Sequence, residues 1–185
     1  MKTFKHLLLT STLLIFTACG TQTQVDQDKV FDLWEYMTSS SNYEVKYDVY
    51  ENNIKVDSYI ELHHQFGDEY ERVSDSGKST LYLNPQSILM HEISGDIDIQ
   101  RYVNLGDRDI FQSPLLKECR FKKFYENYHT KNLNYYNVLQ ITCTTNSNLY
   151  QEFYYGYNEG IVSYYEKNNL IEKEYVKVSE ERIFN

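Results

Sequence analysis

The side chains that most often carry out chemistry are scattered through this sequence. His63 and His64 are adjacent on an expected strand, where successive side chains point to opposite faces, so they cannot bind one metal ion together. His91 and His129 have no second ligand at a spacing typical of zinc, which needs three or four converging ligands. The sequence therefore predicts no metal site and no cofactor.

Two acidic runs have the composition of calcium loops but not their pattern. Asp96-Ile97-Asp98 and Asp107-Arg108-Asp109 lack the central glycine and the terminal glutamate of such loops, so we interpret them as solvated loop charges. The motifs of serine hydrolases, zinc proteases and phosphate-binding loops are also missing. We expect a non-enzymatic protein and no catalytic residues, with a hydrolase built from other residues as the alternative.

Tyrosine is the most distinctive side chain, with 19 copies. An exposed band of them could bind glycan, peptide or lipid, and the alternative is that they are core residues and half-buried strand edges. The candidates for a binding surface are Tyr154, Tyr155, Tyr157, Tyr164 and Tyr165.

The chain is acidic, with a formal net charge of −9. A negative protein is repelled by phosphate backbones, so we expect no nucleic-acid partner.

The first residues have the features of a secretory signal. Lys2 and Lys5 precede the apolar run 7–16, which is too short for a membrane-spanning helix. The segment Phe16-Thr17-Ala18-Cys19-Gly20 resembles the lipobox of bacterial lipoproteins, although leucine is usual in place of Phe16. The resemblance implies that residues 1–18 are a signal peptide and that Cys19 becomes the lipidated N-terminus.

This resemblance also implies a location in the cell envelope. Two or three acyl chains, such as diacylglycerol and palmitate on Cys19, anchor a protein stably, whereas one chain does not. Gly20 stands where aspartate would signal retention in the inner membrane. We therefore expect a lipid anchor in the outer membrane, with the protein facing the periplasm.

With Cys19 assigned to the lipid, an even pair of cysteines is left. In an oxidising compartment Cys119 and Cys143 are expected to form a disulfide. No CxxC motif supports a redox or metal-binding pair.

The mature chain reads as a tether followed by a β-rich region. Val30, Leu33, Trp34 and Met37 share one face of a helix expected over residues 28–38, with Asp26 or Asp28 as its cap. Apolar residues then alternate with a period of two, and turn residues such as Asp75-Ser76-Gly77-Lys78 separate the strands. Ser113-Pro114 suggests the start of a second short helix or an irregular arm over residues 114–126.

These elements predict a mainly β (α+β) fold. We expect a signal peptide at 1–18, a lipidated tether at 19–27 and a single β-rich domain at 28–185. The layout resembles lipoprotein carriers, in which a curved antiparallel sheet or half-barrel cups one or two helices. A closed barrel or a sandwich is the alternative architecture.

The layout resemblance also implies a role, which is the binding or transfer of a lipid-like ligand. The first hypothesis is thus a membrane-anchored envelope lipoprotein with a binding or assembly role. The alternatives are an accessory or inhibitor lipoprotein that docks on an envelope protein, and an envelope hydrolase.

Overall fold

The structure, a computed structural model, describes residues 28–39, 41–168 and 170–183. Its main feature is one antiparallel sheet of 12 strands in the order β10-β11-β12-β13-β14-β2-β3-β4-β5-β6-β7-β9. The strands are β2 (Tyr43–Glu51), β3 (Ile54–Phe66), β4 (Glu69–Ser74), β5 (Gly77–Leu83), β6 (Ser87–Glu92), β7 (Gly95–Gln100), β9 (Phe111–Gln112), β10 (Leu116–His129), β11 (Asn134–Thr145), β12 (Tyr150–Gly156), β13 (Gly160–Lys167) and β14 (Glu172–Arg182). The prediction of a mainly β fold with a curved antiparallel sheet is confirmed.

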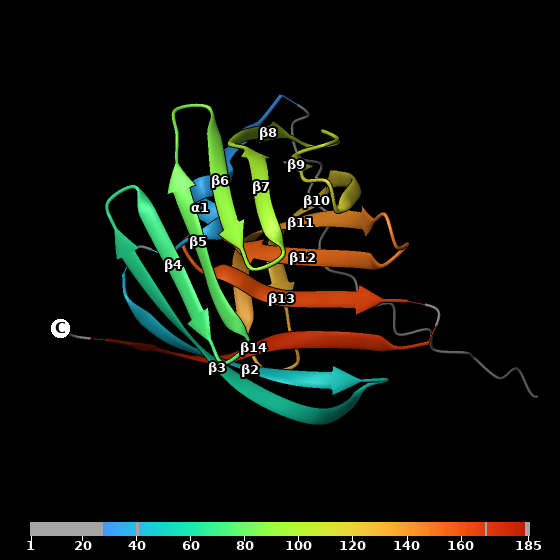
Figure 1. The fold of residues 1–185 in the computed structure, drawn as a ribbon. Helices are drawn as coiled ribbons and strands as arrows, with labels where there is room; N and C mark the ends of the chain where they lie inside the picture. The colour runs from blue at the N-terminus through green and yellow to red at the C-terminus, as the bar shows by residue number, and fades with distance from the viewer. Residues whose placement is uncertain (1–27, 40, 169, 184–185) are drawn as a thin grey trace, which may run out of the picture.

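The sheet folds back on itself in two halves. In Figure 1, strands β4 to β7 run steeply and lie in front, whereas β11 to β14 run closer to the horizontal behind them. The long strand β3 connects the halves, because its residues 54–63 pair with β2 and its residues 62–66 pair with β4. A single strand can therefore leave one layer and enter the other without breaking the ladder of hydrogen bonds.

The two edges of the sheet nearly meet. The chain just before β9 donates and accepts backbone hydrogen bonds with β10: Phe121 N lies 3.0 Å from Asp107 O, and Ile110 N lies 3.4 Å from Cys119 O. These bonds satisfy backbone groups that an open edge would expose. The result is a curved sheet that forms a nearly closed barrel.

The N-terminal helix is shorter than the sequence pattern predicts. Residues Val30–Asp32 form strand β1, which pairs with β8 (Tyr102–Asn104), and only Leu33–Met37 form helix α1. The helix begins at Leu33 because Asp32 is its cap, accepting a hydrogen bond from Trp34 N at 3.1 Å. The prediction that Asp26 or Asp28 caps the helix was therefore wrong. Residues 30–32 pair with β8 as a strand, so the helix can begin only after them.

The predicted second helix is a strand. Ser113 does form a local turn, in which its Oγ accepts a hydrogen bond from Leu115 N at 3.3 Å, but β10 begins at Leu116. Its pairing with β11 runs from Leu116 to His129, so the partner strand supplies the backbone hydrogen bonds that a helix would have made locally. The interpretation of 114–126 as a helix or an irregular arm was wrong for this reason.

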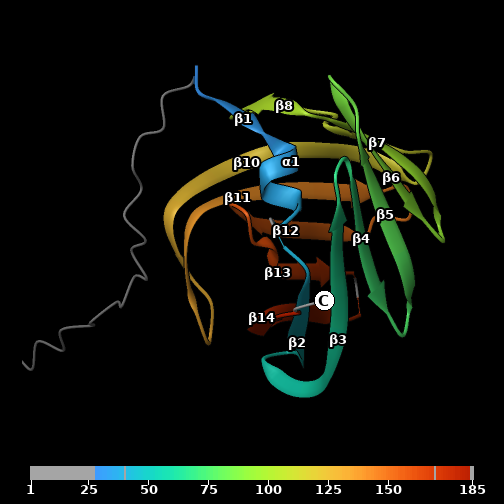
Figure 2. The ribbon, with the colours of Figure 1, turned by 90° about the vertical axis from the view of Figure 1, so that its left-hand side faces the viewer.

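Helix α1 lies at one end of the barrel, beside β12 and β13 and below the β1–β8 pair (Figure 2). Its Leu33 and Met37 are buried in the same cluster as Tyr70, Leu81 and Ile88 from β4 to β6. Removal of so many apolar side chains from water at this end closes the barrel there. The opposite end has no such plug among the described residues, and this asymmetry positions the site described below.

The distal half of the β10–β11 hairpin bends over the outer face of the sheet (Figure 2). There Tyr128 stacks on Tyr154 with ring centroids 4.8 Å apart, and Lys131 forms an ion pair with Glu174. A second, smaller buried cluster forms under the hairpin from Tyr135, Val138 and Val162. Several tyrosines are thus used to pack this hairpin onto the barrel.

The predicted disulfide is present. Cys119 and Cys143 are bonded and lie directly opposite each other in the β10–β11 pair. Both are fully buried in the main core. In the described part of the chain, no helix is long and apolar enough to cross a membrane.

Candidate functional site

A cavity of about 630 Å³ lies between the two halves of the sheet. Its volume falls in the range of about 300–1,000 Å³ that is usual for small-molecule sites. The side chains that line it come from both halves, from β2 to β7, β9, β11 to β14 and the segment 113–116.

Every second residue of β3 and β4 faces the interior, so successive inward-facing residues lie at different depths in the cavity. On β4, Tyr70 belongs to the core at the closed end, Arg72 lines the cavity, and Ser74 lies next to the β4–β5 turn. On β3, His63 is buried opposite Arg72 and reaches the Tyr70 hydroxyl, and Glu61 lines the cavity one inward-facing position further out. Arg72 therefore lies next to the core that closes the barrel, and Glu61 is joined to that core through its hydrogen bond to His63.

The tyrosines and the apolar side chains that line the cavity come largely from different strands. Tyrosines come mainly from β2, β3, β13 and β14: Tyr47, Tyr59, Tyr164 and Tyr175. The apolar side chains come mainly from β6, β7, β9 and β12: Met90, Ile97, Phe111 and Phe153. A cavity of this kind can bury a hydrocarbon group and still offer partners to a polar group.

Arg72 lines the cavity with hydrogen-bond donors that the protein only partly satisfies. Its Nη2 donates to Ser79 Oγ at 3.2 Å and to the weak acceptor Met90 Sδ at 3.7 Å. Its Nε is buried and has no hydrogen-bond partner among the described residues. The ion pair with Glu92 is long, at 3.9 Å. The guanidinium thus retains capacity to donate hydrogen bonds.

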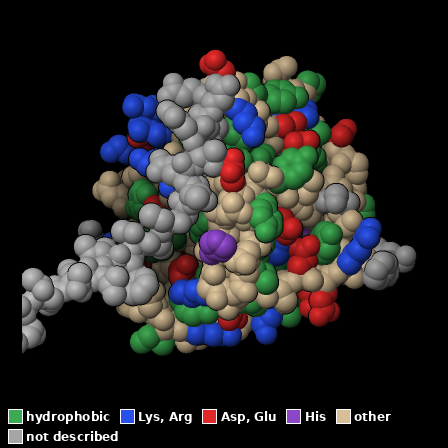
Figure 3. Space-filling view, turned by 180° about the vertical axis from the view of Figure 1, so that it is seen from behind, with side chains coloured by type: hydrophobic (Ala, Val, Ile, Leu, Met, Phe, Trp, Pro, Cys, Tyr) green, Lys and Arg blue, Asp and Glu red, His purple; other side chains and the backbone are tan. Residues whose placement is uncertain are grey.

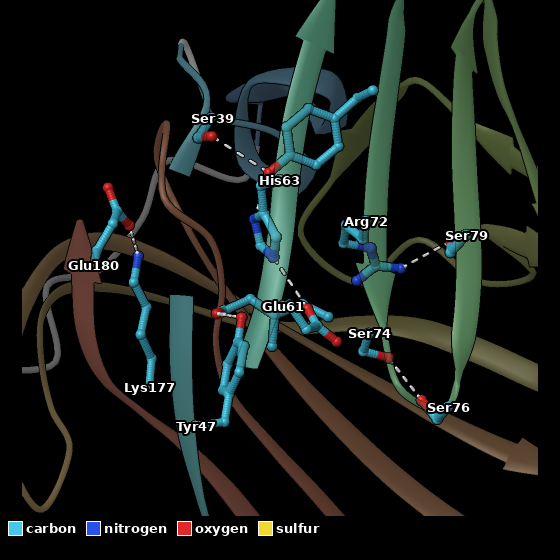
Figure 4. A network of polar contacts seen from close by, with 12 residues as sticks. Ser39, Tyr47, Glu61, His63, Arg72, Ser74, Ser76, Ser79, Lys177 and Glu180 are labelled. Carbon is cyan, nitrogen blue, oxygen red and sulfur yellow. Dashed lines mark hydrogen bonds and ion pairs between the residues drawn. The ribbon is translucent and has the colours of Figure 1, made fainter. Parts of the chain in front are cut away.

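Glu61 is the first member of a chain of hydrogen bonds that runs into the core (Figure 4). Its Oε2 lies 3.0 Å from His63 Nε2, and His63 Nδ1 lies 2.7 Å from the hydroxyl of Tyr70. The Tyr70 hydroxyl lies 3.3 Å from Ser39 Oγ. In Figure 4, Glu61 and Arg72 extend from the neighbouring strands β3 and β4 toward the same space.

The pKa shifts of Glu61, His63 and Tyr70 determine which atoms of these hydrogen-bonded side chains carry a proton. Burial lowers the pKa of His63, although Glu61 opposes the shift, so the imidazole is neutral at pH 7. The pKa of Glu61 is lowered: burial would raise it, but the hydrogen bond from His63 and the charge of Arg72 prevail. An ionised Glu61 can only accept, so Nε2 carries the imidazole proton and Nδ1 accepts from Tyr70, whose pKa burial raises to about 12.

The open end of the cavity is bordered by three turns. They are the β4–β5 turn, the β6–β7 turn and the segment before β10, which contribute Ser76, Ile93 and Leu115. Ile93 is 81% exposed and Leu115 is 51% exposed, so apolar side chains stand at the entrance. Glycine is favoured at position 77 because the residue has φ of +142°, a backbone conformation that residues with a side chain rarely adopt.

The five tyrosines predicted as a binding surface do not form one surface. Tyr155 is buried and Tyr164 lines the cavity, so both face the interior. Tyr154 and Tyr165 face outward and line a shallow hollow over β12 to β14. Tyr157 follows β12 and packs edge-on against Tyr36 of α1, with ring centroids 5.4 Å apart. Period-two alternation separates neighbours such as Tyr164 and Tyr165 onto opposite faces.

The outer hollow is polar and its groups are largely paired. The carboxylate of Glu152 accepts hydrogen bonds from the hydroxyls of Tyr150 and Tyr154 at 2.5 and 2.6 Å. Glu172 forms an ion pair with Lys167. On the back of the molecule, basic and acidic side chains are interspersed with hydrophobic ones (Figure 3).

The remaining predicted site residue, Cys19, and the signal and tether segments lie outside the described residues. Within the described ranges, no three His, Cys, Asp or Glu side chains converge as a metal ion would require. His63 and His64 lie on opposite faces of β3, as alternation predicts: His63 is buried and His64 stacks on Phe66.

Sequence reasoning missed Arg72 and Glu61. The alternating apolar residues Ile54, Val56 and Ile60 suggest that the other face of β3 is the buried one, yet all three are exposed. The available signal was the alternation Tyr59, Glu61, His63, in which two ionisable residues share a face with an aromatic one. Only the pairing of β3 with β4 brings that face next to Arg72.

No protein-family model matches the sequence, and none of the curated proteins matches it either. The solved structures that are similar in shape include the following two. One is a "putative exported protein with YmcC-like fold" of Bacteroides fragilis, with a TM-score of 0.48 and 11% identity over 80% of this chain and 99% of that chain. The other is a "putative lipoprotein" of Parabacteroides distasonis, with a TM-score of 0.42 and 10% identity over the same shares, 80% and 99%. Because both TM-scores are below 0.5, we draw no conclusion from these likenesses.

Proposed function

We propose that this chain is a lipid-anchored protein of the bacterial cell envelope that binds an amphipathic, lipid-like ligand in its barrel. The observation that carries the proposal is the cavity of about 630 Å³, which is closed by core packing at one end and bordered by exposed apolar side chains at the other. Apolar side chains such as Met90 and Phe153 would cover the ligand's hydrocarbon part. Each buried methylene contributes about 0.8 kcal/mol.

A binding role fits the cavity better than nucleophilic catalysis. The hydroxyl of Ser39 is separated from His63 by Tyr70, and Ser39 and His63 are both buried. A serine nucleophile must lie within hydrogen-bond reach of its base and next to the substrate. The Glu61–His63–Tyr70–Ser39 chain instead ties the inner end of the cavity to the core.

The anchor part of the proposal rests on the signal and lipobox pattern at residues 1–20. In this arrangement residues 19–27 tether the domain at 28–185 close to the membrane, and the Gly20 position favours the outer membrane. When the Cys19→Ala protein is expressed in a bacterial host, it should appear in the soluble envelope fraction. Retention of Cys19→Ala on membranes to the same extent as wild type would contradict the lipid anchor.

The binding part is tested by native mass spectrometry of the full-length protein purified from membranes. We expect a co-purifying species that solvent extraction identifies as an amphiphile. Filling the cavity with the double substitution Met90→Trp and Ile97→Trp should remove that species. Ile54→Trp, at a position that is 69% exposed and outside the cavity, is the matched control and should retain it.

A wild-type protein that carries no bound species, and takes up none when mixed with an envelope lipid extract, would contradict the proposal. Docking on an envelope protein would then become the leading alternative.

A further inference from the structure

The inner end of the cavity holds a guanidinium whose hydrogen bonds are not completed by the protein. Among the described residues Arg72 Nε has no hydrogen-bond partner, and Nη2 has a hydroxyl at 3.2 Å, a thioether sulfur at 3.7 Å and the long ion pair with Glu92 at 3.9 Å. A buried donor left without an acceptor costs about 1–3 kcal/mol, and more when it is charged. A ligand that brings an oxygen acceptor to Arg72 would recover this energy.

The charges around Arg72 disfavour an anionic ligand. Glu61 and Glu92 both line the cavity beside Arg72, and both act on the guanidinium to raise its pKa. The remaining cation of the lining, Lys78, is at the rim and is paired with Glu71. One buried guanidinium thus faces two carboxylates, so a third carboxylate would be repelled as well as desolvated.

Glu61 adds an acceptor next to this donor. One of its oxygens, Oε2, binds His63, and the carboxylate lines the cavity beside Arg72. A head group that accepts from Arg72 and donates to Glu61 would use both residues. Ester or amide carbonyls accompanied by hydroxyl groups meet this requirement.

We propose, on the basis of the binding function above, that the ligand has an uncharged head with a carbonyl acceptor and a hydroxyl donor, and that this head lies on Arg72 and Glu61. The ligand enters head first, and its chain lies along Met90, Ile97 and Phe153 toward the open end. The cavity therefore prefers a monoacylglycerol-like amphiphile to a fatty acid of the same chain length.

The test uses two probes that differ only in the head, 1-monolaurin and laurate. Full-length protein in a non-ionic detergent is mixed with equal amounts of both at pH 7.5, and the bound species are counted by native mass spectrometry. We expect monolaurin to exceed laurate at least about tenfold. Because the chains are identical, hydrocarbon burial is the same for both probes and the ratio reports the head group.

Two variants separate the charges. Glu92→Gln removes one carboxylate near Arg72 and should move the ratio toward laurate several-fold, without abolishing binding. Arg72→Met should weaken the binding of monolaurin several-fold, because the carbonyl loses its donor, and should not move the ratio toward laurate, because Glu61 and Glu92 remain. Arg120→Met, a substitution of the same type on the far edge strand β10, is the control and should leave the ratio unchanged. If Arg72→Met does not fold, as judged by circular dichroism, the response of Glu92→Gln decides.

The outcomes are distinguishable. Laurate bound as well as monolaurin, or a ratio that Glu92→Gln leaves unchanged, would overturn the head-group inference and leave lipid binding intact. Binding of neither probe, together with the absence of any co-purifying amphiphile, would overturn the proposed function as well.

Discussion

Arg101 and Asp32 form a bidentate ion pair that ties α1 to the turn between β7 and β8. Arg101 Nε lies 3.0 Å from both carboxylate oxygens of Asp32, and Nη2 lies 2.7 Å from Oδ2. The same carboxylate caps α1 through Trp34 N, and Leu33 N donates to Arg101 O at 2.8 Å. One aspartate thus holds the helix that closes the barrel.

Asp32→Ala should lower the free energy of unfolding by about 2–4 kcal/mol, because it removes both a helix cap and charge-assisted hydrogen bonds. Asp32→Asn keeps a capping oxygen and should cost less than half as much. Urea denaturation followed by circular dichroism measures both. Equal losses for the two substitutions would mean that the cap contributes nothing.

Lys177 is a buried cation, only 1% exposed, whose Nζ lies 2.8 Å from Glu159 and also contacts Glu180. The double substitution Glu159→Gln and Glu180→Gln should cost about 3–5 kcal/mol, because it leaves a buried charge without a counter-ion. Lys177→Met should cost less, since the glutamate side chains are 41% and 20% exposed and water can solvate them.

The partly exposed pair Lys173–Glu51 provides the control for this comparison. Glu51→Gln should cost no more than about 1 kcal/mol, as surface ion pairs usually do. A Lys177→Met protein less stable than the double glutamine variant would show that packing of the lysine stem, not charge, dominates at this site.

The Cys119–Cys143 disulfide closes a loop of about 25 residues, which should stabilise the fold by roughly 3–4 kcal/mol on the chain-entropy model. Cys119→Ala combined with Cys143→Ala should lose about that amount in urea denaturation without reductant. Addition of reductant to the wild type should produce a similar loss and should not change the double variant. A wild-type midpoint that reductant leaves unaltered, with thiol release demonstrated, would refute a stabilising bridge.

His63 should make stability depend on pH. Burial holds its pKa in the folded protein below the ordinary value of 6.5, so the unfolded chain binds more protons as the pH falls through 6.5. Stability should therefore decrease on acidification from pH 7 through 6.5 toward the lower folded pKa, with a slope of at most about 1.4 kcal/mol per pH unit from this one proton.

His63→Gln should flatten the dependence in that pH range, because glutamine does not titrate. His64→Gln is the matched control: it changes the adjacent histidine on the opposite face of β3 and should keep the slope. The measurement is urea denaturation at half-unit pH intervals between 7.5 and 5. A His63→Gln protein with the wild-type slope would assign the dependence to other groups.

The sequence by itself determined the local features of this protein. Alternation of apolar and polar residues located strands such as Tyr43–Glu51, and Asp75-Ser76-Gly77-Lys78 located a hairpin turn, which lies between Ser74 and Gly77 of the paired strands. These features depend on backbone and side-chain preferences within a few residues, which a sequence displays directly. The cysteine pairing followed from the count of cysteines and the expected compartment.

The tertiary structure alone decided which strand faces point inward and how far elements extend. Residues 30–32 and 116–125 became strands because partners more than ten residues away supply their backbone hydrogen bonds, and no local pattern contains those partners. Likewise Glu61 and Arg72 meet inside a cavity because β3 and β4 pair in one register and the sheet folds across itself. Long-range pairing and burial outweigh local propensity, and they created the candidate site.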